Sequence, residues 1–133
     1  MATITRFEDI EAWQLGRELK RAIYAATKQG DFARDFPLRD QIRRAAMSIT
    51  ANIAEGFERG GTREFIQFLS YSKGSCGEVQ DHLYTALDEG YVPQAEFQRL
   101  YSQTAAVAGK VGGFMKYLQQ TEIRGQKFRG RPT

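Results

Sequence analysis

Three short breaks rich in glycine or proline divide most of the chain into four segments of similar length. The residues that mark these breaks are Gly30 with Pro37, Gly60 with Gly61, and Gly90 with Pro93. Glycine is common just after the end of a helix, and proline in the first turn of the next one. Apolar residues recur at the helical interval of three or four positions in residues 7–28, 37–59, 63–89 and 94–119. Because short connections favour antiparallel neighbours, the sequence predicts an all-α, antiparallel, up-down-up-down four-helix bundle over residues 1–120.

The excess positive charge of the chain lies at its C-terminal end. The 133 residues contain 19 Lys and Arg against 16 Asp and Glu, a net charge of +3. Within residues 121–133, Glu122 is the one acidic residue, and the basic ones are Arg124, Lys127, Arg129 and Arg131. The rest of the chain is therefore neutral, so nucleic-acid binding is favoured only by this segment and by local clusters. Because residues 121–133 lack apolar periodicity, we expect them to form a disordered basic tail.

The sequence offers little for catalysis or for metal binding. One Cys and one His exclude a disulfide framework and a Cys/His zinc site. Cys76 lies on an apolar stripe, where a small core residue is expected, and His82 is expected at the edge of the core. The chain contains no paired Glu-x-x-His motifs and no Gly-rich phosphate loop. We therefore expect a non-enzymatic protein without a cofactor, a metal or a small-molecule substrate.

The sequence also lacks the signals of export and of membrane insertion. Its first residues show no basic flank followed by an apolar stretch, and no run approaches the roughly 20 apolar residues of a membrane helix. We expect a cytoplasmic protein.

Two of the expected helices carry more apolar surface than one bundle stripe requires. The residues that flank the main stripes are Ile10, Trp13 and Tyr24 in the first segment, and Val107, Phe114 and Tyr117 in the fourth. Wide apolar arcs in a short chain favour self-association, although these side chains could instead fold over the bundle edges. Interior glycines such as Gly77 and Gly109 favour close helix packing, either within the chain or between copies.

A polar line follows the second helical segment and includes Ser48, Asn52 and Glu55. Ser and Asn are poor helix formers, so their place in mid-helix indicates specific hydrogen bonds. One interpretation is a polar site that also uses Arg43, Arg44 and Arg63. We favour the other, an interhelical network in which Glu55 pairs with an Arg and Asn52 bonds to a neighbouring helix.

Residues 41–79 resemble the 23S rRNA-intervening sequence proteins, a bacterial family of four-helix bundles. The family pattern reads here as Arg43-Arg44-Ala45-Ala46-Met47-Ser48-Ile49, followed by Asn52-Ile53-Ala54-Glu55-Gly56. Further matching segments are Glu64-Phe65 with Phe68-Leu69, then Gly74-Ser75-Cys76-Gly77-Glu78. The family is similar in fold to the accessory protein of diversity-generating retroelements, a pentamer that binds nucleic acid and a reverse transcriptase. The resemblance therefore implies a homopentamer.

Two functions follow as hypotheses. The first is an oligomeric scaffold that binds RNA, DNA or a nucleic-acid enzyme, because phosphate contacts add up over several copies. Its candidate contacts are Arg39, Arg43, Arg44, Arg59 and Arg63, together with Arg124, Lys127, Arg129 and Arg131 of the tail. The second is a protein-interaction module without a nucleic-acid role, favoured by the acidic segment 63–89, where five acidic residues face two basic ones.

Overall fold

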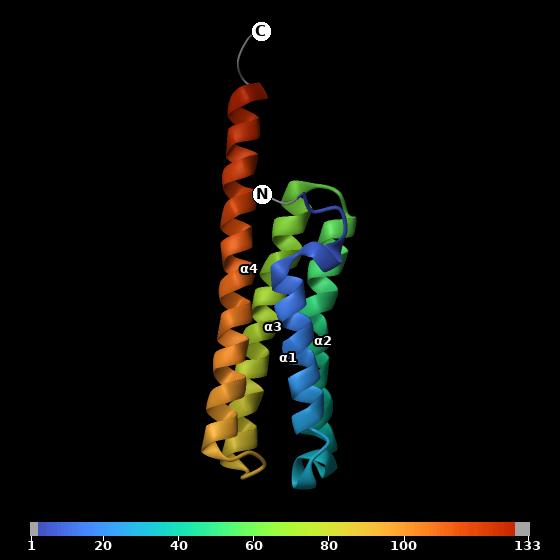
Figure 1. Cartoon of the computed structure of the whole chain (residues 1–133), viewed down its shortest axis with the longest axis vertical. Coiled ribbons are helices and arrows are strands. Elements are labelled where there is room, and N and C mark those ends of the chain that lie inside the picture. The colour runs from blue at the N-terminus through green and yellow to red at the C-terminus, as the bar shows by residue number, and fades with distance from the viewer. Residues whose placement is uncertain (1–2, 130–133) are drawn as a thin grey trace.

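The computed structural model describes residues 3–129, with side chains described for residues 3–122. Four α-helices follow one another: α1 (Glu11–Ala26), α2 (Phe36–Glu58), α3 (Thr62–Asp88) and α4 (Gln94–Arg129). Two short 3-10 helices, η1 (Phe7–Asp9) and η2 (Gly30–Arg34), precede α1 and α2. Successive helices run in opposite directions, and α1 lies beside α2 and α4 (Figure 1). The predicted all-α, up-down-up-down bundle is confirmed.

The breaks predicted from glycine and proline lie at the helix ends. Gly30, Gly60 and Gly90 have positive φ angles of 49°, 82° and 75°, a conformation that glycine adopts without strain. Asp35 precedes α2, and its Oδ1 accepts a hydrogen bond from the backbone N–H of Leu38 at 3.1 Å. This N-cap and Pro37 in the first turn fix where α2 begins.

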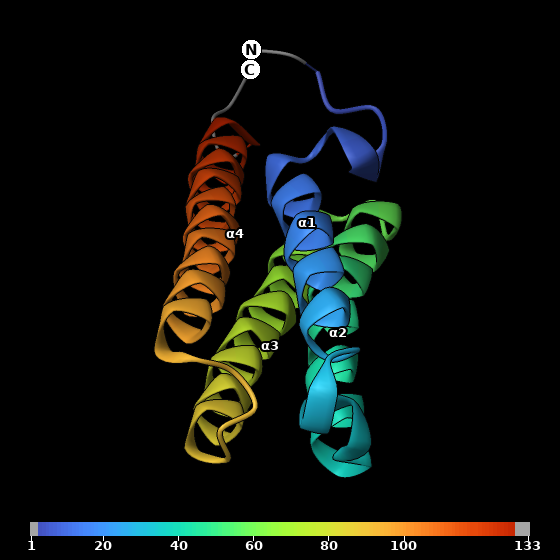
Figure 2. The same ribbon diagram turned by 60° about the horizontal axis from the view of Figure 1, so that its bottom comes forward.

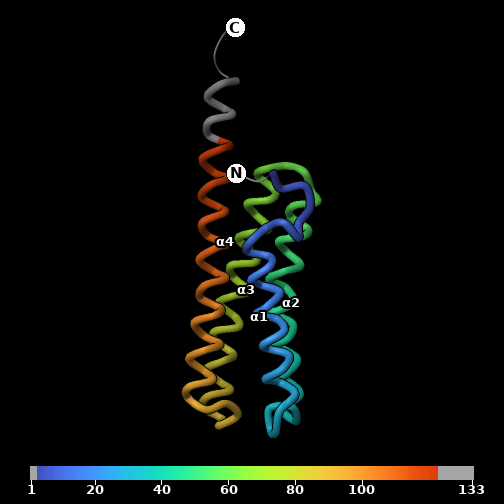
Figure 3. Tube along the Cα trace, in the orientation of Figure 1, coloured from blue at the N-terminus to red at the C-terminus, as the bar shows by residue number. Residues whose placement is uncertain are grey.

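Two predicted helix bounds are wrong. The first expected helix, 7–28, is interrupted at Ile10, whose extended backbone separates η1 from α1. The fourth was expected to end near residue 119, but α4 continues to Arg129 and projects past the other three helices (Figure 1). The Cα trace in Figure 3 shows the antiparallel course of the four helices. Residues 121–129 of the expected tail therefore lie in α4, and residues 130–133 lie outside the described residues. Residues 121–129 continue a helix that the bundle has already nucleated, and extending a helix costs far less than starting one.

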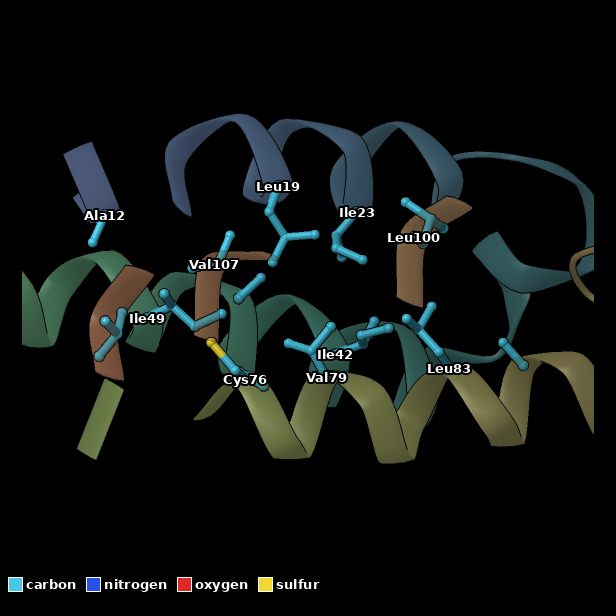
Figure 4. Close-up of a cluster of buried hydrophobic side chains, with 14 of the residues drawn as sticks. Ala12, Leu19, Ile23, Ile42, Ile49, Cys76, Val79, Leu83, Leu100 and Val107 are labelled. Carbon is cyan, nitrogen blue, oxygen red and sulfur yellow. The ribbon is translucent and has the colours of Figure 1, made fainter. Parts of the chain in front are cut away.

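The core fills the space between the four helices along most of their length. Its fully buried side chains include Leu19 of α1, Ile42 and Ile49 of α2, Val79 and Leu83 of α3, and Leu100 and Val107 of α4 (Figure 4). Cys76 is also fully buried, as predicted, and burial raises the pKa of its thiol to about 11.

Two glycines bring α2 close to its neighbours. A Cβ at Gly16 of α1 would lie 3.0 Å from the side chain of Thr50, and one at Gly56 of α2 would lie 2.7 Å from Cβ of Phe68. By contrast, a Cβ at Gly74, Gly77 or Gly109 would meet no atom within 4 Å. Close packing within the chain therefore does not explain those three surface glycines.

Candidate nucleic-acid interface

The five arginines predicted as a basic cluster do not converge in the structure. Arg39 pairs with Asp40 at 3.0 Å, Arg59 with Glu55 at 3.0 Å, and Arg63 with Glu122 at 2.7 Å. Arg44 is exposed on α2. Three of the five guanidinium groups are thus neutralised by carboxylates, which lowers their attraction for phosphate.

Arg43 instead points toward α1. Its Nε donates a hydrogen bond to Oγ1 of Thr27 at 2.7 Å, and its guanidinium carbon lies 4.6 Å from the ring centre of Tyr24. The hydroxyl of Tyr24 in turn donates to Sδ of Met47 at 3.3 Å. These contacts fix Arg43 at the outer seam between α1 and α2.

Other cations of α1 lie along the same seam. Lys20 donates from Nζ to Oγ1 of Thr50 in α2 at 3.3 Å, and Arg17 lies 5.9 Å from the ring centre of Trp13. Residues three or four positions apart share one helix face, so Arg17 and Arg21 flank Lys20 and Tyr24 there. We call the following five residues the basic face: Arg17, Lys20, Arg21 and Arg43, with Lys28 in the turn that follows α1.

The basic face is electrostatically uncompensated within the part of the chain that has described side chains. None of its five cationic groups has a carboxylate oxygen within 4.0 Å among those side chains. Arg17, Arg21 and Lys28 are exposed, and Lys20 and Arg43 are half-buried. Like charges held together raise the local potential, and phosphates are the anions that such rows of Lys and Arg bind.

Sequence reasoning found only Arg43 of this face. The signal for the others was present, because Arg17, Lys20, Arg21 and Lys28 recur at helical spacing on the first helix. The net charge of the first helix conceals this row of cations, because Glu11 and Glu18 lie on the same helix and reduce that net charge. Glu11 faces α4, where it pairs with Lys110 at 3.2 Å, so it does not neutralise the seam with α2.

The basic residues predicted in the C-terminal tail have a different placement. Arg124, Lys127 and Arg129 belong to the end of α4, and their side chains lie outside the described set. Arg131 lies outside the described residues.

The polar line on α2 forms a hydrogen-bonded network with α3. The side-chain amide of Asn52 donates to the backbone oxygen and to Oγ of Ser48, at 2.8 and 2.9 Å. Oγ of Ser75 in α3 lies 2.9 Å from Oγ of Ser48 and 3.2 Å from the backbone oxygen of Tyr71. The amide of Asn52 thus bonds within α2, to Ser48, and the prediction that it bonds to a neighbouring helix is wrong. Glu55 pairs with an arginine, Arg59, as predicted. Asn52 and Glu55 do not form a shared site with Arg43 or Arg63.

The six residues predicted at an oligomer interface divide into two groups. Ile10 and Val107 are each 1% exposed and belong to the chain's own core, so these two predictions are wrong. Trp13, Tyr24 and Phe114 are half-buried, whereas Tyr117 is 48% exposed. Val107 lies three residues after Thr104 and four before Val111, so it belongs to the buried stripe of α4. Ile10 lies in the extended break between η1 and α1 (Figure 2), and its side chain belongs to the core.

His82 is the one histidine of the chain. His82 is half-buried at the edge of α3, with Nδ1 3.9 Å from Oδ2 of Asp81. Within the described residues, no three His, Cys, Asp or Glu side chains are grouped to hold a metal ion. No helix in that range is long and apolar enough to cross a membrane.

Comparisons with known proteins agree with this architecture. A crystal structure of a protein of unknown function from the S23 ribosomal protein family of Bacteroides thetaiotaomicron superposes with a TM-score of 0.72. The match covers 79% of this chain and 95% of that chain at 18% sequence identity, and at this identity it shows a shared fold alone. No curated protein matches the sequence. The family described as 23S rRNA-intervening sequence protein matches residues 8–113, which span α1 to the middle of α4. The chain therefore belongs to the 23S rRNA-intervening sequence protein family.

Proposed function

We propose that this protein is a non-enzymatic, self-associating scaffold of the cytoplasm that binds the phosphate backbone of RNA or DNA through the basic face. The observation that carries this proposal is the row of five cationic groups along the α1–α2 seam that has no carboxylate beside it among the described side chains. The basic residues at the end of α4 would add further phosphate contacts.

Backbone binding, rather than recognition of a base sequence, fits the chemistry of this face. Lys and Arg contacts to phosphate position a protein on nucleic acid but carry no sequence information. The two aromatic rings of the seam, Trp13 and Tyr24, are each covered by an arginine and are half-buried, so they offer little surface for stacking of bases. We therefore expect weak sequence preference and a steep dependence of affinity on salt.

Self-association would multiply these contacts. Each additional copy that engages the same nucleic acid binds at a high effective concentration, so weak contacts combine into strong binding. Five copies are the number implied by the family resemblance. The basic face lies along the α1–α2 seam, so self-association through another side of the bundle would leave it accessible.

A second candidate function is a protein-interaction module. It is favoured by the acidic outer side of α3, where Glu78, Asp81 and Asp88 are exposed. This surface repels phosphate and would attract a basic protein. Capture of a partner from a lysate that persists after nuclease treatment would favour this alternative, and loss of capture would favour the first proposal.

The proposal is tested by binding of labelled 20-nucleotide RNA and duplex DNA, followed by fluorescence anisotropy at low salt. The variant Arg17→Gln with Arg21→Gln removes two cations of the basic face. Its matched control is Arg34→Gln with Arg99→Gln, which removes two exposed arginines that pair with Asp31 at 3.2 Å and Glu96 at 2.6 Å. We expect the first variant to weaken binding about tenfold or more and the control to bind like the wild type. Equal losses in the two variants, or no binding by the wild type, would reject the proposal.

A further inference from the structure

The sulfur atoms of the chain differ sharply in their access to solvent. The sequence contains three methionines and one cysteine, and Met1 lies outside the described residues. Cys76 is fully buried, and Met115 of α4 is half-buried and packs against the core. Met47 of α2, by contrast, is 43% exposed. Among the described side chains, an oxidant dissolved in water therefore reaches the sulfur of Met47 most easily.

Met47 lies in the seam that carries the basic face. Its Sδ accepts a hydrogen bond from the hydroxyl of Tyr24 at 3.3 Å, and the ring centre of Tyr24 lies 4.6 Å from the guanidinium carbon of Arg43. Arg43 and Arg44 precede Met47 by four and three residues, so they share its side of α2. The thioether is thus surrounded by groups that can donate hydrogen bonds.

A second cation approaches Met47 from α1. Oγ1 of Thr50 donates a hydrogen bond to the backbone oxygen of Met47 at 3.2 Å, and the same hydroxyl accepts one from Nζ of Lys20 at 3.3 Å. Met47 therefore lies between Lys20 and Arg43, two of the five cations that we assign to phosphate binding. A chemical change at its sulfur takes place within the basic face.

We infer that Met47 is a site of reversible oxidation by peroxides, and that its sulfoxide weakens the binding of phosphates to the basic face. This regulation rests on the proposed function, because it acts on the same five cations. The position of the modification does not rest on it, since that follows from the exposure of the sulfur alone.

The chemical step is the transfer of one oxygen atom from hydrogen peroxide to Sδ. A lone pair of the sulfur attacks one peroxide oxygen, so that an S–O bond forms and the O–O bond breaks. The sulfur is oxidised by two electrons, which reduce the peroxide. The proton of the transferred oxygen passes to the departing hydroxide, which leaves as water. Methionine sulfoxide reductases reverse the change with two electrons from thiols, and the oxygen again leaves as water.

The sulfoxide places a new acceptor among the donors of the basic face. A thioether sulfur accepts hydrogen bonds only weakly, whereas the sulfoxide oxygen is polar and carries partial negative charge. This oxygen competes with phosphate for the N–H groups of Arg43 and Arg44, which lie within about one helical turn of Met47. It also lowers the positive potential of the seam. Oxidation is therefore expected to reduce the affinity for phosphate.

The fold should tolerate the added oxygen at this position. Because Met47 is exposed, its sulfoxide keeps contact with water. Oxidation of Met115 would instead place a polar group against the apolar core. We therefore expect oxidation of Met47 to change binding without unfolding the protein, and circular dichroism melts of the oxidised chain check this.

The first part of the test locates the modification. The full chain is treated with hydrogen peroxide, quenched at intervals and mapped by mass spectrometry of tryptic peptides. Trypsin separates the described methionines, because Arg44 and Arg59 bound the peptide of Met47, whereas Lys110 and Lys116 bound that of Met115. We expect Met47 to be oxidised about fivefold faster than Met115 in the folded chain, and the two at equal rates in urea.

The second part measures the effect on binding by fluorescence anisotropy with a labelled duplex at low salt. We expect the oxidised wild type to bind about threefold or more weakly, and methionine sulfoxide reductases with a thiol to restore the affinity. Met47→Leu keeps a similar volume without a sulfur, so its affinity should be the same before and after peroxide. Met115→Leu is the matched control, and its affinity should fall as in the wild type.

The outcomes separate this inference from the proposed function. Equal rates of oxidation at Met47 and Met115 in the folded chain would overturn the assigned site. An affinity that is unchanged by oxidation of Met47, or an equal loss in the Met47→Leu variant, would overturn the regulation and leave phosphate binding intact. A wild type that binds no duplex before oxidation would reject the proposed function and its regulation together, and the peptide map would still decide the site of oxidation.

Discussion

Gly56 of α2 lies so close to Phe68 of α3 that a Cβ on the glycine would be 2.7 Å from the Cβ of the phenylalanine. It would also lie 2.9 Å from the Cδ1 atom of Phe65. Real Cβ atoms do not approach each other this closely, so any larger residue must push α2 and α3 apart. The Asn52-Ile53-Ala54-Glu55-Gly56 segment therefore ends on a residue whose small size sets the distance between two helices.

Gly56→Ala is expected to lower the free energy of unfolding by about 1–3 kcal/mol, because overpacking outweighs the gain in helix propensity. Its control is Gly77→Ala, at a helical glycine with open space around it. There only the propensity changes, and the free energy of unfolding should rise by about 0.5–1 kcal/mol. Urea unfolding at one protein concentration measures both. A stabilised Gly56→Ala variant would contradict the close approach.

Asp35 joins the two turns at one end of the bundle. Its Oδ1 accepts from the backbone N–H of Leu38, and its Oδ2 accepts from the hydroxyl of Tyr91 at 2.8 Å. Asp35→Ala removes both bonds and should lower the free energy of unfolding by about 1–2 kcal/mol, the cost of a lost N-cap. Tyr91→Phe removes only the second bond and should cost about 1 kcal/mol or less. Thermal melts of both variants measure which substitution destabilises the protein more. An equal loss of stability in the two variants would show that the N-cap contributes nothing.

Asp9 fixes the segment that precedes α1. The pKa of Asp9 is lowered from its usual 3.8, chiefly because its carboxylate accepts a hydrogen bond from the backbone N–H of Thr5, with further bonds from the Thr5 hydroxyl and the Arg6 N–H. The folded pKa lies below the unfolded value, so this contribution is fully present above about pH 4 and is lost as the pH falls through the lowered pKa.

Acidification should therefore loosen residues 3–10 from the bundle. Trp13, the single tryptophan, packs against Phe7 with ring centres 5.2 Å apart, so its fluorescence reports this change. Asp9→Asn should show a smaller difference in fluorescence between pH 6 and pH 3 than the wild type. Identical acid titrations of the two proteins would show that Asp9 does not hold the segment.

Cys76 should be chemically inert in the folded protein. Burial raises the pKa of its thiol to about 11, so little of the reactive thiolate exists at pH 8, and the side chain is inaccessible. Iodoacetamide at pH 8 should leave the native protein unmodified over a period in which the urea-unfolded protein reacts completely. Mass spectrometry distinguishes the two, and rapid alkylation of the native chain would contradict the position of Cys76 in the core.

The fold was predictable because its signals are local. Gly30, Gly60 and Gly90 punctuate the chain, and each segment between them repeats apolar residues at the helical period. The end of α4 was not predictable in this way, since residues 121–129 lack apolar periodicity in the sequence and only continue a helix that is already formed. Ile10 was misassigned because the predicted helix 7–28 placed it on a helical wheel, whereas it lies in the extended break between η1 and α1. The spacing of Val107 to Thr104 and Val111 already placed it on the buried stripe of α4.

The candidate site was less predictable than the fold. The α2 motif favoured Arg39, Arg59 and Arg63 as phosphate contacts. In the structure they pair with Asp40, Glu55 and Glu122. Whether an arginine is neutralised depends on carboxylates up to 59 residues away in sequence, as for Arg63. The basic face depends on α1 and α2 lying side by side, which periodicity alone does not reveal.

The central claim is that the basic face binds phosphates, and the dependence of affinity on salt tests it most directly. The logarithm of the association constant falls with the logarithm of salt concentration by about 0.9 for each duplex phosphate neutralised. For a 20-base-pair duplex, Arg17→Gln with Arg21→Gln should reduce this slope by roughly 2 for each engaged copy, and Arg34→Gln with Arg99→Gln should leave it unchanged. A slope that is equal in the wild type and in the Arg17 and Arg21 variant would contradict the account.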